Sequence, residues 1–141
     1  MVEEPKRFPK YSMKIMTDTN ILFSALLFPE SRPAKALFHV VRYHNLILCD
    51  YIISELQNVV SRKRPDLAAD IDVFMAKLPY ELIPAPLQPG KLISDPKDYP
   101  ILNAAIIADV DIIISGDRHF LDLPMEHPKP MSVAEFLDEM I

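Results

Sequence analysis

Four acidic side chains stand where separate segments of the chain can bring them together. Asp18 closely follows the apolar pair Ile15–Met16, and Asp117 comes two residues after the apolar run DIIIS. Glu55 stands shortly after the apolar run LILC, and Asp98 begins the helical pattern that leads into DIIIS. Two carboxylates 4 Å apart repel by about 4 kcal/mol at an effective dielectric near 20. Mg²⁺ and Mn²⁺ relieve such repulsion and often bridge carboxylates to phosphate, which indicates phosphodiester chemistry.

These acids meet only if their strands lie side by side in one parallel sheet. Apolar runs that predict strands alternate along the chain with segments of helical periodicity. The sequence therefore predicts an α/β fold in which a mainly parallel sheet of about four to five strands is flanked by helices in three layers. Ligands of open α/β sheets bind outside the carboxyl ends of the strands. Strands are predicted near 15–17, 46–49, 81–83, 111–115 and 131, and helices near 19–27, 32–44, 51–63, 66–78, 96–109 and 133–140.

Each acid also has an ordinary structural explanation. Asp18 and Asp117 follow strands at positions that favour a helix N-cap. Asp98 in a first helical turn complements the helix dipole, and Glu55 alone is typical of a solvated helix face. Asp95 precedes a proline and is predicted to cap the same helix, with a supporting role beside the site as the alternative. The position of each acid, considered alone, is compatible with both helix capping and ligand binding.

Length and composition are those of one globular domain with a genuine core. The chain has 141 residues, is 50% hydrophobic and carries a net charge of −5, which argues against broad electrostatic adhesion to nucleic acid. Cys49 is the only cysteine and is predicted to be a buried thiol, so cysteine-rich zinc sites and internal disulfides are excluded. With no membrane span or signal peptide visible, a cytoplasmic protein is expected. Residues 1–12 are predicted to be an extension, with disorder as one interpretation of it, and residues 13–141 the domain.

Other titratable side chains have weaker signals. His39, His44, His119 and His127 lack the helical pairing of a zinc site and are predicted to be surface-exposed or partly packed. Asp50 follows the LILC strand and is predicted to cap the next helix.

Four motifs give the sequence a more specific resemblance. MTDTNIL, SELQNVV, DPKDYPILNAA and IIISGDRHF occur in this order and carry the four acids. Together they resemble PIN-domain proteins of the kind found as VapC-like toxins of toxin–antitoxin pairs, over essentially 13–141. The resemblance implies a three-layer PIN-like fold and a Mg²⁺- or Mn²⁺-dependent endoribonuclease that hydrolyses phosphodiester bonds. It also implies an RNA substrate and allows for a cognate antitoxin and a homodimer.

The same resemblance assigns roles to individual residues. It makes the four acids the catalytic and metal-binding set, with two smaller side chains as polar contacts beside the metal. Within DPKD, Asp98 is preferred over Asp95 because the helix pattern Ile101 and Ala104–Ala105 follows it as in the family. The implied set is Asp18, Glu55, Asp98 and Asp117, supported by Asn20 and Ser115.

Two further functions and one further surface are weighed against this interpretation. A haloacid-dehalogenase-type phosphatase also begins with a strand that ends on an aspartate, but it needs a second acid where this chain has Asn20. A non-toxin RNA-processing or RNA-binding protein on the same fold is the other alternative.

The cations Arg62, Lys63 and Arg64 end a helix and complement its dipole by default. Contact of these three, or of Arg118, with substrate phosphate is the competing hypothesis.

Overall fold

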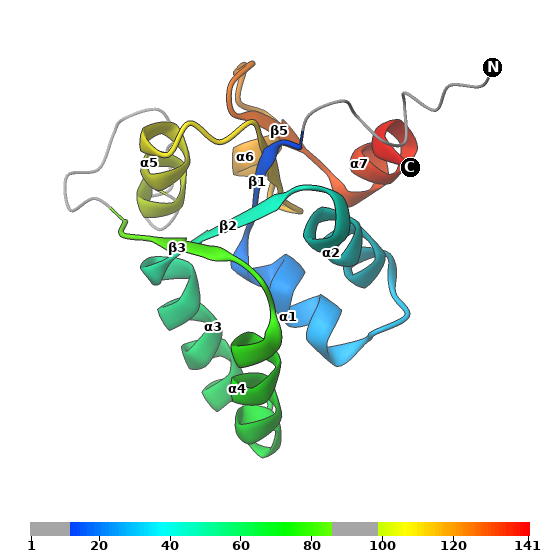
Figure 1. The fold of residues 1–141 in the computed structure, drawn as a ribbon. Helices are drawn as coiled ribbons and strands as arrows, with labels where there is room; N and C mark the ends of the chain where they lie inside the picture. Colours follow the sequence, from blue (N-terminus) through cyan, green and yellow to red (C-terminus); the bar gives the residue numbers. More distant parts are fainter. Residues whose placement is uncertain (1–11, 86–98) are drawn as a thin grey trace.

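The central feature of the computed structural model, which describes residues 12–85 and 99–141, is a five-stranded parallel sheet (Figure 1). The strand order is β3-β2-β1-β4-β5, so the first strand of the chain lies in the centre. All four strand pairs are parallel. The predicted three-layer α/β class is confirmed. The strands are β1 (Lys14–Thr17), β2 (Asn45–Cys49), β3 (Glu81–Ile83), β4 (Ile112–Ile114) and β5 (Lys129–Met131).

Helices connect these strands and cover the sheet, as the alternating pattern predicts. A helical connection is what lets consecutive strands run parallel, because each must return to the starting edge. In Figure 1, α3 and α4 lie next to each other and extend away from the sheet. The described helices are α1 (Thr19–Leu27), α2 (Arg32–Tyr43), α3 (Asp50–Lys63), the 3-10 turn η1 (Pro65–Leu67), α4 (Ala68–Lys77), α5 (Tyr99–Ile107), α6 (Arg118–Leu121) and α7 (Val133–Met140).

The core fills the space between the sheet and its helices. Both faces of the central strands are covered, which explains why β1, β2 and β4 are continuous apolar runs rather than alternating ones. Phe120 and Phe136 are among the largest fully buried side chains. Ser132 begins α7 with the predicted capping box, in which its hydroxyl accepts from the Glu135 N–H and the Glu135 carboxylate accepts from the Ser132 N–H. The short α7 is thereby held at a defined start.

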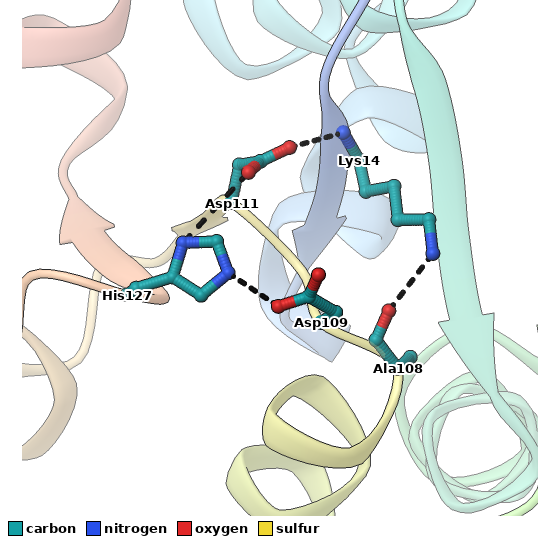
Figure 2. Close-up of polar contacts among 5 residues, drawn as sticks. All are labelled: Lys14, Ala108, Asp109, Asp111 and His127. Atoms are coloured by element: carbon teal, nitrogen blue, oxygen red, sulfur yellow. Dashed lines mark hydrogen bonds and ion pairs between the residues drawn. The ribbon is translucent and has the colours of Figure 1, made fainter.

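Polar contacts at the amino ends of β1 and β4 fix how these two strands align (Figure 2). The Lys14 N–H donates to the Asp111 carboxylate at 2.9 Å, and the Asp111 N–H donates to the Lys14 carbonyl at 2.8 Å. The Lys14 ammonium donates to the Ala108 carbonyl just after α5, and His127 bridges Asp109 at 2.8 Å and Asp111 at 3.7 Å. The end of α5 is thus held beside the start of β1.

Several local predictions are wrong in detail. Asp50 does not cap α3: the helix has no side-chain cap, and the Asp50 carboxylate accepts from the Ala85 N–H instead, which joins α3 to the segment after β3. The helix predicted from Asp66 is divided into η1 and α4. His39 and His44 are buried rather than on the surface: the His39 ring packs against Phe136, and the His44 ring accepts a hydrogen bond from the Met13 N–H.

Some predictions concern residues outside the described ranges. Asp95 and Asp98 are among them, as is the expected extension of residues 1–12 apart from Ser12. None of the helices within residues 12–85 and 99–141 combines the length and apolar composition needed to cross a membrane.

Candidate active site at the carboxyl edge of the sheet

Asp18 stands at the end of the central strand and is almost fully buried, with 6% of its surface exposed. It is the N-cap of α1, and its Oδ1 accepts from the Ile21 N–H at 3.0 Å. The predicted capping role is therefore confirmed. A carboxylate offers about four lone-pair positions. Capping uses one of them, so it does not compete with a role for Asp18 as a ligand.

Ser115 joins the ends of β1 and β4. The two strands pair with Thr17 opposite Ile114, so the next residues, Asp18 and Ser115, are also adjacent. The fully buried Ser115 hydroxyl donates to Asp18 Oδ2 at 2.6 Å and accepts from the Asp117 N–H at 2.9 Å. One hydroxyl thereby links the acid that follows β1 to the segment that carries the acid following β4.

Asp117 is half-buried and begins the short helix α6. Its Oδ1 accepts from the His119 N–H at 2.8 Å, and the ring Nδ1 of His119 lies 3.3 Å from the same oxygen. Asp117 is therefore an N-cap, as its ordinary interpretation predicts. Its second carboxylate oxygen has no protein partner among the described residues, which leaves it available to a ligand.

Glu55 reaches the same edge from the second turn of α3. The hydroxyl of Thr19, the residue after Asp18, donates to Glu55 Oε1 at 2.5 Å. Glu55 is half-buried, and its carboxylate has a protein partner in Thr19. Because Thr19 is covalently next to Asp18, this contact ties α3 to the end of β1.

The environment of Asp18 disfavours its charged form. Burial raises the pKa of the Asp18 carboxyl, and the nearby Asp117 carboxylate raises it further. Hydrogen bonds from Ser115, Ile21 and the Gly116 backbone oppose this effect. A buried acid beside a second acid is an arrangement that a bound cation stabilises, because the cation compensates both the lost hydration and the repulsion.

The remaining predicted residues divide into those that the structure describes and those that it does not. Asn20 lies in the first turn of α1 and is exposed. Within residues 12–85 and 99–141, no three histidine, cysteine, aspartate or glutamate side chains gather closely enough to hold a metal ion. Asp18 and Asp117 suit a hard divalent cation by their chemistry. The third acid that the resemblance implies, Asp98, lies outside the described residues.

The predicted phosphate-binding cations differ in their surroundings. Arg64 forms a two-point contact with Asp66, at 3.0 and 2.9 Å, and Arg118 lies 3.5 Å from Asp122. Arg62 instead lines an open groove of about 530 Å³ along α3, together with Glu55. Lys63 is exposed at the end of the same helix. The cations that the sequence presents as one cluster are therefore not equivalent.

The sequence matches the PIN domain family over residues 14–119, about three quarters of the chain. The chain belongs to the PIN domain family. PIN domains are generally nucleases, so the site at the carboxyl edge lies in a protein of a nuclease family. This membership removes the support for the haloacid-dehalogenase alternative.

A solved structure has the same PIN fold. A chain from the crystal structure of VapBC2 from Rickettsia felis, bound to a DNA fragment from their promoter, matches with a TM-score of 0.67 at 19% identity. The match covers 85% of this chain and 98% of that chain. Among curated proteins, no match to the sequence was found.

Sequence reasoning missed two features of this PIN domain. From the sequence, Thr19 is only a small polar residue suited to the start of a helix. Its hydrogen bond to Glu55 depends on how α1 and α3 pack. The groove beside Glu55 was also missed. Its signal is visible in the sequence, because the lining residues recur at helical spacing on one face of α3: Tyr51, Ser54, Glu55, Asn58, Ser61 and Arg62.

Proposed function

We propose that this PIN domain is a divalent-metal-dependent endoribonuclease that hydrolyses phosphodiester bonds in RNA. The observation that carries the proposal is the buried Asp18, joined through the Ser115 hydroxyl to the segment of Asp117. An arrangement that served only to cap two helices would not require burial of a charged group next to another acid. Such burial is unfavourable without a compensating charge.

Asp18 and Asp117 would hold the metal, and Asp98 is proposed as the third acid. Support for Asp98 comes from α5, which starts at the next residue in the chain, Tyr99. Ala108, just after the last residue of α5, accepts a hydrogen bond from Lys14 at the amino edge of the sheet. The first residues of α5 therefore lie toward the opposite, carboxyl edge. Mg²⁺ or Mn²⁺, when bound, supplies a Lewis acid that lowers the pKa of a water and neutralises phosphate charge.

The protein side chains then have distinct roles. Ser115 holds the Asp18 carboxylate in one orientation, with its second hydrogen bond fixing the start of the Asp117 segment. The hydrogen bond from Thr19 restrains Glu55. Glu55 would then orient or deprotonate the attacking water. Asn20, exposed one residue further along α1, is proposed to contact the substrate or metal hydration shell.

The test is cleavage of RNA by the purified protein with Mg²⁺, Mn²⁺ or EDTA. We expect cleavage with either metal, none with EDTA, and a loss of at least a hundredfold in Asp18→Asn and Asp117→Asn. Asp138→Asn is the matched control, because Asp138 is exposed on α7 away from the site. Far-ultraviolet circular dichroism verifies folding. Full activity of a folded Asp18→Asn protein would disprove the mechanism.

We further propose that the protein is the toxin of a toxin–antitoxin pair. Support comes from the fold shared with a chain of the VapBC2 complex, whose two components are crystallised together with promoter DNA. Induction in a bacterial host should arrest growth, and Asp18→Asn should abolish the arrest. Co-expression of a small protein encoded beside this gene should restore growth and copurify with the wild type. Growth unaffected by an active enzyme would instead favour the alternative, a PIN domain that processes RNA without acting as a toxin.

A further inference from the structure

The groove along α3 begins at the proposed active site. Its lining residues occupy one stripe of the helix, and at about 1.5 Å per residue the stretch from Glu55 to Arg62 spans about 10 Å. Glu55 connects the groove to Asp18 through its hydrogen bond with Thr19. Glu55 therefore belongs both to the groove and to the proposed active site.

The chemistry of the groove changes along its length. Along the helix the lining starts with Tyr51, Ser54 and Glu55, continues through Asn58 and Ser61, and ends at Arg62. Ser54, Asn58 and Ser61 supply hydroxyl and amide groups, and Tyr51 adds an aromatic ring. Uncharged donors and an aromatic ring suit the bases and ribose hydroxyls of an unpaired strand, while a single cation suits one phosphate.

Arg62 differs from its neighbour Arg64 in having no acidic partner among the described residues. Arg64 is neutralised by Asp66 through two hydrogen bonds, and Arg118 lies near Asp122. Arg62 lines the groove, and no acid among the described residues compensates its charge. The protein carries a net charge of −5 and as a whole repels nucleic acid, so the positive charge of Arg62 favours binding of a phosphate at this one place.

We propose that this groove binds the single-stranded continuation of the RNA substrate, with Arg62 on a phosphate several nucleotides from the cleaved bond. The inference rests on the proposed function. A stacked strand rises about 3.4 Å per nucleotide, so 10 Å corresponds to about three nucleotides. Arg62 is therefore a substrate-binding residue that a dinucleotide is too short to reach.

The first measurement is binding of a fluorescent ten-nucleotide single-stranded RNA by anisotropy with Mn²⁺, in the Asp18→Asn background so that the strand stays intact. Adding Arg62→Ala should weaken binding about three- to tenfold and reduce the slope of log affinity against log salt by about 0.7, the value for one phosphate contact in a single strand. Arg64→Ala is the matched control and should change neither quantity by more than about twofold.

The second measurement is cleavage of the ten-nucleotide RNA and of a dinucleotide in the otherwise wild-type protein. Arg62→Ala should raise KM for the longer substrate with kcat unchanged, and should leave dinucleotide cleavage unaltered. Equal loss on both substrates, unchanged binding of the longer RNA, or an equal effect of Arg64→Ala would overturn the inference. Absence of cleavage in the wild type together with Arg62-dependent binding would refute the nuclease proposal and leave the RNA groove standing.

Discussion

Replacement of Ser115 by alanine tests the contact that joins the two strands of the site. The hydroxyl makes two hydrogen bonds in a fully buried position, one to the Asp18 carboxylate at 2.6 Å and one from the Asp117 N–H at 2.9 Å. A hydrogen bond to a charged group contributes about 1.5–3 kcal/mol, and an ordinary one about 1 kcal/mol. We expect Ser115→Ala to lower the free energy of unfolding by about 2–4 kcal/mol.

The assay is urea denaturation at pH 7.5 in EDTA. Ser132→Ala is the matched control, because its hydroxyl also accepts a backbone N–H, that of Glu135, but has no carboxylate to donate to at the site. A lost N-cap of this kind costs about 1 kcal/mol. The difference between the two variants therefore reports the bond to the buried carboxylate.

A double-mutant cycle with Asp18→Asn isolates that bond. The coupling free energy between Ser115 and Asp18 should be at least 1 kcal/mol, since the two side chains are in direct contact. Cleavage by Ser115→Ala should also fall at least tenfold while the protein remains folded, because Asp18 is no longer oriented. A coupling free energy below about 0.5 kcal/mol would refute the assignment of Ser115 as the link between the strands.

Three further perturbations follow from named contacts. Burial lowers the pKa of His44 to about 4, so the unfolded chain takes up a proton first as pH falls below 6.5. The free energy of unfolding should fall as the pH drops from 6.5 toward 4, and the loss at pH 5 should be about 1–2 kcal/mol. Urea denaturation of His44→Phe is the check: a pH dependence equal to that of the wild type would contradict this prediction. Phe136→Ala should cost about 3–5 kcal/mol in the same assay, because the ring is fully buried against His39. Thr19→Val should lower RNA cleavage about tenfold through loss of the Glu55 contact, with unfolding changed by only about 1 kcal/mol. Wild-type cleavage in Thr19→Val would show that Glu55 needs no such restraint.

The local elements were predictable because their signals are local. Apolar runs such as DIIIS specify a strand covered on both faces, and Ser132 with Glu135 specifies a helix start through groups only three residues apart. The failure at Asp50 has the opposite cause. Its side chain prefers the Ala85 N–H, 35 residues away, over the cap of its own helix, and periodicity contains no information about such a contact.

The candidate site shows the same division. The sequence by itself determined which residues have the chemistry, since Asp18 and Asp117 follow apolar runs and belong to motifs in the family's order. Only the tertiary structure decided that Ser115 joins them, because that contact requires β1 and β4 to be neighbours although 97 residues separate Ser115 from Asp18. It likewise distinguished Arg62 in the groove from the paired Arg64. Composition and spacing fix the kinds of groups available, whereas their burial and partners depend on how distant segments pack.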